Sequence, residues 1–386
     1  MTRIRDIWVT GRKTQTVLDI LTGNGAEALF VGGCVRNALL GAPVNDIDIA
    51  TDAIPADVMR WARAAGLKTV PTGLEHGTVT VISDGAPFEI TTFRRDVETD
   101  GRRAVVTFSK ELAEDARRRD FTINALYARP DGTVVDPLGG MVDLRARRVR
   151  FIENAKKRIE EDYLRILRFF RFSAWYGDPE LGFDQDALSA IATHLDGLEA
   201  LSKERVGSEV LKLLAAPDPA PAVATMREIG VLNRILPGAN DRALGPLVHI
   251  EQSVQAPDDA LRRLSALGAE NHVTQLRLSK AQARVVKQLK EAAVSTMGPA
   301  ELGYRLGPQL AVDSLLLRSA LLETDFDKNS LTVAHEGSRA VFPVSAADLI
   351  DAYSGPQLGK RLAKLESAWV ASGFSLSKAE LLGRDL

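Results

Sequence analysis

The chain changes character near residue 150, and this change limits what it can fold into more than any other feature. Before it, short apolar runs alternate with helical stretches and glycine-rich turns; after it, apolar residues recur at helical spacing, as from Ile159 to Phe170. An Ala- and Pro-rich stretch at 215–221 punctuates these helices and is a candidate boundary. We therefore expect an α+β fold with a mixed-sheet head and an all-α remainder, divided into 1–148 (head), 149–215 (helical neck) and 216–386 (helical body and tail).

Length and composition narrow the class of protein. The 386 residues suffice for two or three compact units, and the formal net charge of −2 does not by itself indicate a nucleic-acid partner. No apolar run reaches the ~18 residues that span a bilayer, and Met1 to Lys13 lacks the apolar segment of a signal peptide. The single cysteine, Cys34, permits no intramolecular disulfide and reads as a small core residue. We expect a cytoplasmic protein with no membrane partner, and no protein partner is implied.

The head is expected to alternate short strands and helices. A buried strand breaks at a glycine pair and leads into a helix. Two later strands flank Ser83-Asp84-Gly85-Ala86, which has the composition of a hairpin turn. In order, the expected elements are a strand at 29–31, a helix at 34–40, a strand at 44–50, a helix at 57–65, and strands at 78–82 and 87–93.

The segment Asn45-Asp46-Ile47-Asp48-Ile49 carries the most informative pattern. Side chains alternate across a strand, so Asp46 and Asp48 would share one face while the two isoleucines pack on the core. Adjacent carboxylates repel each other, and a divalent cation would offset that repulsion. Mg²⁺ suits such a site, and phosphoryl-type chemistry often uses two ions. We predict Asp46 and Asp48 as metal ligands; for an isolated Asp-x-Asp, a solvated strand face is the alternative.

A third carboxylate has similar surroundings. Phe88 and Ile90 would face the core, and Glu89 would lie on the opposite side of its strand. If this strand neighbours the one that carries Asp46 and Asp48, Glu89 completes an acidic triad. We therefore predict all three acids as catalytic residues.

A glycine pair precedes these acids. Gly32 and Gly33 separate the first strand from a helix, and glycines let backbone N–H groups approach a phosphate without a Cβ in the way. A helix N-terminus favours an anion, and Arg36 would add a positive charge one turn later. A plain turn between a strand and a helix is the alternative for this pair alone.

Six motifs follow one another in a fixed order. They are Gly32-Gly33-x-x-Arg36, Asp46-Ile47-Asp48, Arg118-Arg119-Asp120-Phe121-Thr122-Ile123-Asn124-Ala125, Asp136-Pro137-Leu138-Gly139-Gly140, Glu161-Asp162-Tyr163-Leu164-Arg165 and Glu204-Arg205-Val206. A glycine turn shortly before two acids on one strand resembles the polymerase β-like nucleotidyltransferase superfamily. With the downstream motifs, residues 28 to 215 are similar to the class II tRNA nucleotidyltransferase and bacterial poly(A) polymerase family. The tail, 216–386, carries no assigned motif.

The resemblance implies roles at the matching positions. Asp46 and Asp48 would hold metal, with Glu89 the third acid of a polymerase β-like head. The segment 94–108 matches a mobile loop that helps change specificity from C to A. The nucleotide-binding residues that the resemblance implies are Gly32, Gly33, Arg36, Arg119, Asp120, Asn124, Asp162, Arg165 and Arg168, of which Arg119 and Asp120 match the ribose-recognising segment and Asp162 and Arg165 the base-reading pair.

The base-reading role has a physical basis. Asp162 and Arg165 stand three residues apart, so on a helix they would face the same way. A carboxylate accepts from the exocyclic amino group of cytosine or adenine, and a guanidinium donates to a ring nitrogen or carbonyl. Such a pair would favour C and A without a template. The alternative is a surface ion pair between the two side chains.

The resemblance implies an enzyme that adds C, C and A to the 3′ end of tRNA from CTP and ATP. Two alternatives keep the chemistry: a poly(A) polymerase, or an enzyme that adds only CC or only A. An inactive RNA-binding module is a third, although all three acids are retained. Arg103-Ala104-Val105 departs from the His-Pro pair that relatives often carry there. The scattered histidines do not indicate the phosphohydrolase domain that some family members carry.

Overall fold

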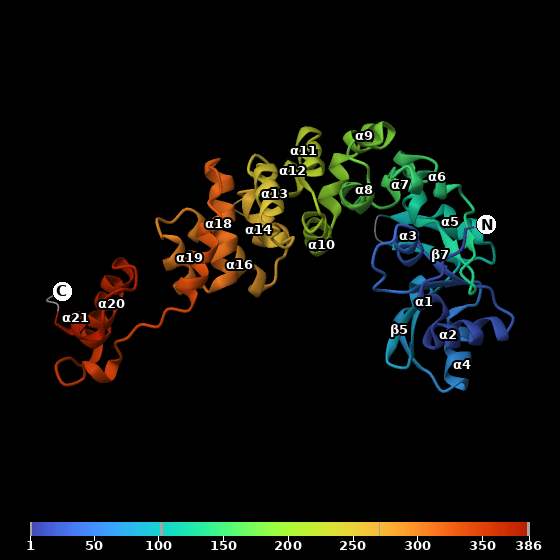
Figure 1. Cartoon of the computed structure of the whole chain (residues 1–386). Helices are drawn as coiled ribbons and strands as arrows, with labels where there is room; N and C mark the ends of the chain where they lie inside the picture. The colour runs from blue at the N-terminus through green and yellow to red at the C-terminus, as the bar shows by residue number, and fades with distance from the viewer. Residues whose placement is uncertain (1, 101–102, 270, 384–386) are drawn as a thin grey trace. The chain divides into compact units, whose positions relative to one another are not determined.

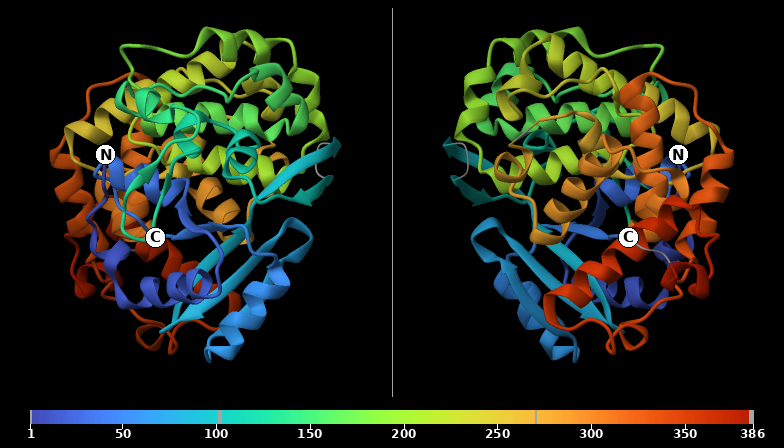
Figure 2. Two further views of the ribbon diagram at one scale, coloured as in Figure 1. Left: turned by 90° about the vertical axis from the view of Figure 1, so that its right-hand side faces the viewer. Right: turned by 90° about the vertical axis from the view of Figure 1, so that its left-hand side faces the viewer.

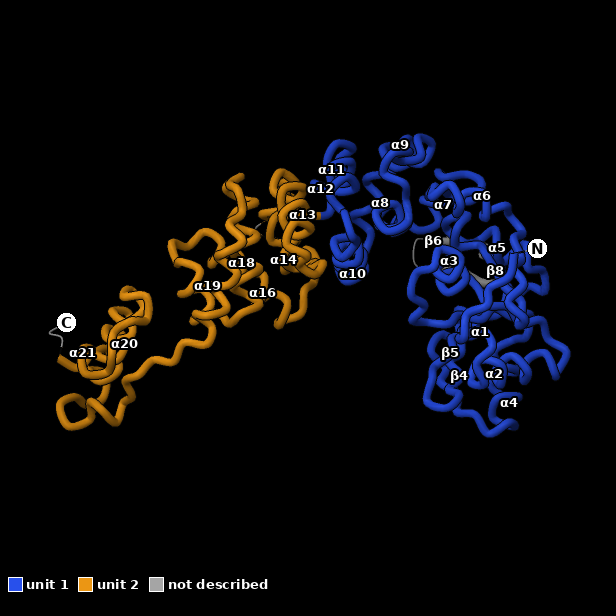
Figure 3. The backbone as a smooth tube through the Cα atoms, in the orientation of Figure 1, with its two compact units in different colours: residues 1–235 blue, residues 236–386 orange. Residues whose placement is uncertain are grey.

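The computed structural model describes residues 2–100, 103–269 and 271–383. The chain forms two compact units, residues 1–235 and 236–386 (Figure 3). The first unit holds the strands and the helices up to α12, and the second is helical (Figure 1). A mixed sheet with helices, followed by a helical C-terminal part, confirms the expected fold class.

The elements of the first unit come before residue 236. Its strands are β1 (Ala28–Val31), β2 (Asp48–Thr51), β3 (Lys68–Gly73), β4 (Thr78–Ser83), β5 (Ala86–Thr92), β6 (Arg94–Asp100), β7 (Arg103–Phe108), β8 (Tyr127–Ala128) and β9 (Val134–Val135). Its helices are α1 (Ile7–Thr10), α2 (Arg12–Gly23), α3 (Gly33–Leu39), α4 (Pro55–Ala64), α5 (Leu112–Arg117), α6 (Gly140–Arg145), α7 (Ala155–Glu161), α8 (Leu164–Tyr176), α9 (Gln185–Ala192), α10 (Lys203–Leu214), α11 (Ala220–Glu228) and α12 (Val231–Ile235), with short 3-10 turns η1 (Leu74–His76), η2 (Thr122–Asn124) and η3 (Leu195–Ala200).

Within the described residues, seven strands form one sheet in the order β3-β4-β5-β2-β1-β8-β9. Strands β2 and β5 are parallel, and the other neighbours are antiparallel. The turn at Asp84-Gly85 joins β4 to β5 as expected, and both residues have positive φ. In β5, Phe88 and Ile90 are buried and Glu89 is exposed, which confirms the predicted alternation.

The expected strand at 44–50 is shorter in the structure. Strand β2 begins at Asp48, so Asp46 lies in the loop before it and the two acids do not share a strand. The reason lies in the neighbouring strand: β1 pairs with β2 from Ala28 to Phe30, and the chain then turns into α3 at Gly32. On the β1 side of β2, the residues before Asp48 therefore have no strand partner with which to continue the ladder.

Each face of the sheet has its own apolar cover. Helices α2 and α4 contact β3, β4 and β5. One core cluster joins Leu29 and Val31 of β1 with Ala50, Ala116 and Tyr127. Because Asp48 lies two residues before Ala50, its side chain is on the same face as this cluster. Burial of these apolar side chains fixes the positions of the strand ends that carry the acids.

The segment 94–108 forms an antiparallel ribbon of β6 and β7. Arg94 pairs with Phe108 in register, and a register shift occurs between Asp96 and Glu98. Figure 2 shows the two strands side by side. Gly101 and Arg102, part of the loop expected from the family resemblance, lie outside the described residues.

The helical stretch expected from Ile159 to Phe170 is interrupted. Helix α7 ends at Glu161, and Asp162 has extended backbone angles, φ −158° and ψ 105°. Its carboxylate accepts from the N–H of Leu164 at 3.1 Å, a local hydrogen bond that competes with the helix. The prediction that Asp162 and Arg165 lie three residues apart on one helix is therefore wrong, because Asp162 precedes α8 and Arg165 lies within it.

The neck packs around aromatic side chains. Phe169 and Phe170 on α8 are buried and lie 5.4 Å apart between ring centroids. The rings of Phe121, in the head, and Phe151, just after it, lie 6.3 and 5.7 Å from that of Phe169. The head and helix α8 thus share one aromatic core, which sets the position of the side chains on α8.

The second unit consists of helices around several apolar clusters. They are α13 (Leu244–Ser253), α14 (Ala260–Ala266), α15 (His272–Gln275), α16 (Lys280–Ala293), α17 (Pro299–Leu306), α18 (Pro308–Leu322), α19 (Asn329–Ser338), α20 (Gly355–Ala371) and α21 (Lys378–Leu382), with the turn η4 (Ala346–Asp348). Arg262 and Arg263 are fully buried and pair with Glu251 at 2.7 and 2.8 Å. Across residues 2–100, 103–269 and 271–383, every helix is too short or too polar to span a bilayer.

Candidate active site

The glycine pair forms a sharp turn between β1 and α3. Gly32 has φ of 72° and ψ of −119°, which residues with a Cβ rarely adopt, and its N–H donates to the carbonyl of Leu126 at 3.0 Å. A Cβ at Gly32 would lie 3.5 Å from Nη1 of Arg119. Gly33 begins α3. The predicted turn is present, and Arg119, predicted from a distant motif, lies beside it.

The predicted acids gather at the end of the parallel strand pair. Asp48 begins β2 and is in register with Glu89 on β5, so the two side chains share a face of the sheet. Burial raises the pKa of Asp48 to about 6; Glu89 and Asp46 add repulsion, and Arg119 opposes it. The neighbouring strands that were predicted for Asp48 and Glu89 are therefore present.

The acid cluster is open, and it is not a finished metal cage. Among the residues that the structure describes, no three His, Cys, Asp or Glu side chains are arranged to hold a metal ion together, so the expected triad is not a preformed three-ligand site. Asp46 and Glu89 are exposed, whereas Asp48 is half-buried. These donors fit a hard divalent cation, because they are carboxylate oxygens whose repulsion it would relieve, and water and phosphate oxygens supply its other ligands.

Arg119 is held by two residues that sequence analysis did not single out. Its Nε and Nη2 donate to Oδ2 of Asp115 at 3.3 and 3.0 Å, and Nε also donates to the hydroxyl of Tyr127 at 3.0 Å. The Tyr127 hydroxyl donates to the same carboxylate oxygen at 2.7 Å. Nη1, the nitrogen near Gly32, has no hydrogen-bond partner in the described part of the chain. It can therefore donate to a ligand at the glycine turn.

Asp115 anchors this group. Its side chain is 1% exposed, and its Oδ1 pairs with Nη2 of Arg118 at 2.7 Å. Although burial opposes the shift, the charges of Arg119 and Arg118 lower the pKa of Asp115 to about 2. Asp115 lies in the last turn of α5, three and four residues before Arg118 and Arg119, which directly follow the helix. That spacing is the sequence signal that could have identified it.

Asp120 and Asn124 connect the head to α8. Oδ2 of Asp120 accepts from Nε of Arg168 at 2.7 Å, and Oδ1 accepts from Nδ2 of Asn124 at 2.9 Å. Burial opposes the shift, but the Arg168 charge and the hydrogen bonds from Asn124 and Arg168 lower the pKa of Asp120 to about 2. Arg168 also lies 3.9 Å from Glu209 on α10. Three predicted residues are thus brought together, with their polar atoms bonded to one another.

Arg36 is buried, which the sequence pattern did not indicate. Its Nη2 donates to Oδ1 of Asn37 and to the hydroxyl of Tyr176, both at 2.9 Å, and its Nη1 donates to Oδ1 of Asn124. The guanidinium carbon lies 4.0 Å from the ring centroid of Tyr176 and 5.1 Å from that of Phe172. Burial lowers the pKa of Arg36. These donors point to protein groups, so the phosphate contact predicted for Arg36 stays a prediction.

Asp162 is paired with Arg205, whose motif was noted in the sequence without a role. Nη2 of Arg205 donates to Oδ2 of Asp162 at 2.6 Å. Both side chains remain partly exposed, at 26% for Asp162 and 30% for Arg205. A carboxylate offers about four lone-pair sites, so Asp162 keeps acceptor capacity beyond the bonds to Arg205 and Leu164.

Arg165 is fixed by a different set of partners. Its Nη1 donates to Oε2 of Glu161 at 2.6 Å and to the carbonyl of Arg158 at 2.9 Å, and its Nη2 donates to the carbonyl of Arg118 at 2.9 Å. The surface ion pair considered for Asp162 and Arg165 is not what orders them, since each has its own partner. Both predicted base-reading side chains are held by protein groups before any ligand binds.

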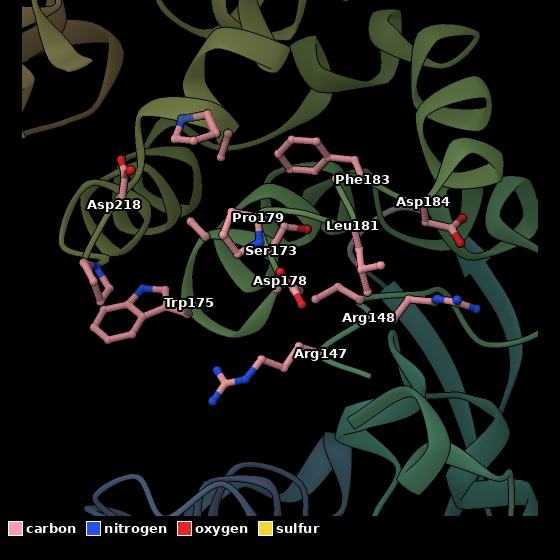
Figure 4. A pocket seen from close by; sticks show the side chains of 17 residues that line it. Arg147, Arg148, Ser173, Trp175, Asp178, Pro179, Leu181, Phe183, Asp184 and Asp218 are labelled. Atoms are coloured by element: carbon pink, nitrogen blue, oxygen red, sulfur yellow. The ribbon is translucent and has the colours of Figure 1, made fainter. Parts of the chain in front are cut away.

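A pocket of about 390 Å³ lies elsewhere in the first unit (Figure 4). Trp175, Leu181 and Phe183 contribute apolar surface to it, and Arg147 and Asp178 contribute polar groups. Pockets of this size are common ligand sites, yet among the described residues that line it none is a predicted site residue. Pocket size therefore does not locate the candidate site in this chain, whereas the charged clusters around the glycine turn do.

Comparison with known families supports two regions of the first unit. Residues 28–150 match the family described as "Poly A polymerase head domain", and residues 181–242 match the one described as "Probable RNA and SrmB- binding site of polymerase A". The first match contains the glycine turn, the acids and Arg119. The second begins after α8 and extends beyond α12.

Similar proteins cover nearly the whole chain. The mouse mitochondrial CCA tRNA nucleotidyltransferase 1 is 32% identical over 394 residues, with 98% of this chain and 90% of that protein covered. The CCA-adding enzyme of Lacticaseibacillus paracasei is 34% identical over 385 residues, with 95% and 94% covered. The solved CCA-adding enzyme of Bacillus stearothermophilus in complex with CTP has a TM-score of 0.74 and 27% identity, with 94% and 93% covered. The chain therefore belongs to the nucleotidyltransferase family that contains the CCA-adding enzymes and shares its head domain with poly(A) polymerase.

Proposed function

We propose that this chain is a CCA tRNA nucleotidyltransferase, which adds C, C and A to the 3′ end of tRNA from CTP and ATP without a nucleic-acid template. One observation carries the proposal: the carboxylates of Asp48 and Glu89 are in register beside a glycine turn that Arg119 adjoins. This arrangement offers acids for a cation and donors for a triphosphate in one place. The identity of the nucleotides and of the tRNA substrate is inferred from the names of the similar proteins.

Asp46 and Asp48 are the residues that would hold the cations, with Glu89 as the third acid. Two Mg²⁺ ions, when bound, would lower the pKa of the attacking 3′-hydroxyl and balance the charge of the leaving pyrophosphate. The protein's own part is positioning: the N–H of Gly33 and Nη1 of Arg119 donate to phosphate oxygens, while the N–H of Gly32 is bonded to Leu126 and holds the turn. Asp115 keeps the Arg119 side chain from rotating away, because two nitrogens of Arg119 already donate to the Asp115 carboxylate.

Base selection is assigned to Asp162 and Arg165. The Asp162 carboxylate accepts from the exocyclic amino group that cytosine and adenine share, and Arg165 donates to a ring nitrogen or carbonyl. Arg205 and Glu161 hold these side chains at fixed positions, so selection needs no template. Arg168, Asp120 and Asn124 belong to the same proposed nucleotide-binding set, with Arg119 and Asp120 nearest the ribose.

The division of labour along the chain is part of the proposal. Residues 1–148 would carry catalysis, 149–215 base recognition, and 216–386 tRNA binding. A cytoplasmic location is part of the proposal and is supported by the single buried cysteine, which suits a reducing compartment; two of the similar proteins are mitochondrial.

Poly(A) synthesis is the second candidate, because both matched families are described by polymerase A. Incubation with tRNA lacking its terminus, offering each nucleotide alone and in pairs, separates the candidates. Two C from CTP alone and a final A from CTP with ATP are expected. Long A tails from ATP alone would favour poly(A) synthesis, additions that stop at CC or need pre-existing CC would indicate a partial enzyme, and no incorporation with Mg²⁺ would leave an inactive RNA-binding module.

A further inference from the structure

Helix α3, which begins at the glycine turn, is bonded to helix α8 of the neck through one side chain. Arg36 on α3 is 6% exposed and donates to the hydroxyl of Tyr176, the last residue of α8, at 2.9 Å. The guanidinium also lies over the Tyr176 ring at 4.0 Å, a distance at which a cation and an aromatic face attract. The hydroxyl and the ring therefore bind Arg36 together.

A chain of hydrogen bonds extends from this contact. Nη1 of Arg36 donates to Oδ1 of Asn124, whose Nδ2 donates to Asp120, and Asp120 accepts from Arg168. Arg168 and Tyr176 are both on α8, so the chain leaves this helix and returns to it through the head. Bonds at both ends of such a network resist rotation of one helix against the other more than a single contact does.

The two joined elements address opposite ends of a nucleotide under the proposed function. Helix α3 begins at the turn assigned to the triphosphate. The residues assigned to the base lie at the start of α8, with Asp162 just before this helix and Arg165 in its first turn. A fixed distance between them determines whether a base that is correctly held also places its α-phosphate for attack. Reactions of this kind lose rate steeply when the reacting groups are held less accurately.

We propose that Tyr176 is a positioning residue for nucleotide transfer, which fixes Arg36 and through it the glycine turn at a set distance from the base-reading residues. The proposal rests on the proposed function, because it assigns a task within that reaction. Tyr176 itself touches no reacting group. Its effect passes through Arg36, for which the structure thus supplies a different task from the phosphate contact predicted from sequence.

Two substitutions at Tyr176 separate the contributions of its hydroxyl and ring. Tyr176→Phe keeps the ring and removes the acceptor, and we expect kcat for CTP addition to fall about tenfold while the Kd for CTP changes less than about twofold. Tyr176→Leu also removes the cation–π contact, and we expect a fall of about a hundredfold. In both variants the preference for CTP over UTP should narrow.

Trp175→Phe is the matched control, since it removes one hydrogen bond at the same end of α8. The Trp175 Nε1 donates to the carbonyl of Lys212 at 2.8 Å, a bond inside the neck that does not reach the head. We expect kcat and CTP/UTP preference within about twofold of the unmodified protein. Melting temperatures of all variants show whether each is folded at the assay temperature.

A double-substitution cycle tests whether Tyr176 acts through Arg36. If it does, Tyr176→Phe should cost little further activity in an Arg36→Lys background, because the bond is already lost. Equal kcat and CTP/UTP preference in Tyr176→Phe and Trp175→Phe would overturn the positioning role, as would a change confined to melting temperature. An unmodified protein that transfers no nucleotide to tRNA would instead overturn the proposed function itself.

Discussion

The acids at the end of the β2–β5 strand pair and the acids at the junction of head and neck are arranged in opposite ways. Burial raises the pKa of Asp48 to about 6, and the neighbouring charges of Glu89 and Asp46 add to the shift. Asp115 and Asp120 lie against arginines, and the pKa of each is lowered to about 2. The first group leaves its negative charge for a ligand to balance, whereas the second uses its charge to hold arginines. In these three carboxylates the pKa is raised where burial and neighbouring acids act together, and it is lowered where arginine charges outweigh burial.

This difference has consequences for stability. A carboxylate that repels its neighbours lowers the stability of the fold, a cost that proteins tolerate at functional sites. A carboxylate paired with buried arginines cannot be removed without leaving those arginines unpaired. Substitutions in the first group should therefore mainly lower activity, and substitutions in the second should mainly lower stability. For Asp48 and Asp115 the expected changes in the free energy of unfolding have opposite signs.

The largest expected effect is the loss of transfer activity when an acid at the end of the β2–β5 strand pair is removed. Asp46→Ala and Asp48→Ala should each lower incorporation of labelled CTP into truncated tRNA by several thousandfold or more, because each removes a proposed cation ligand. Melting temperature should show that both variants fold. Asp84→Asn, at an exposed turn position with φ of 46°, is the control and should keep full activity. Rates equal to the unmodified protein in both variants would refute the assignment of these two acids.

The next prediction compares the changes in the free energy of unfolding that two substitutions cause, which should have opposite signs. Asp115→Asn should lower the free energy of unfolding by about 3 to 5 kcal/mol, because it leaves Arg118 and Arg119 without their buried partner. Asp48→Asn should raise it by roughly 1 kcal/mol in buffer with a chelator, because it removes the cost of burying a charged carboxylate and the repulsion from Glu89. Urea unfolding at pH 7 measures both. Destabilisation of similar size in the two variants would show that the acids do not differ as described.

The sequence predicted the fold class and the alternation of side chains in β5, because these depend on local patterns. Apolar alternation in β5 placed Phe88 and Ile90 in the core, and ordered motifs identified the family. The predicted length of β2 was wrong, because its partner β1 ends before the turn at Gly32. The residues of one strand do not show where its partner strand ends. Long-range partners set that boundary.

The arginines show the same limit within the site. Motif positions named Arg36 and Arg119 alike, yet Arg36 is bonded to Tyr176, 140 residues away, and Arg119 keeps Nη1 beside the glycine turn. Whether a guanidinium meets a ligand or a protein group depends on which side chains the fold brings near it. Asp115 could have been found, since its spacing to Arg119 follows helical periodicity. Tyr176 could not.

Loss of the Asp162 carboxylate should change the choice of nucleotide more than it changes the rate of transfer. Asp162→Ala removes the carboxylate proposed to accept from the cytosine amino group, and we expect the preference for CTP over UTP to fall about a hundredfold with a smaller loss in kcat. Arg165→Ala should narrow the same preference. Single-turnover addition with each nucleotide measures both quantities. Unchanged discrimination in both variants would remove the base-reading role and leave Asp162 as a partner of Arg205 only.

The smallest effect is a pH dependence at Asp120. Its pKa is about 2 in the fold against 3.8 when unperturbed, so it contributes stability that is present above about pH 4 and is lost as the pH falls toward 2. The shift of nearly two units corresponds to roughly 2 kcal/mol. Asp120→Asn cannot titrate, so it should be less stable than the unmodified protein at pH 6 but lose less stability between pH 6 and pH 2.5. Asp186→Asn, an exposed acid at the start of α9, should keep the original slope. If Asp120→Asn lost as much stability as the unmodified protein over this range, Arg168 would not be what holds the Asp120 charge, and the contrast with Asp48 would rest on Asp115 alone.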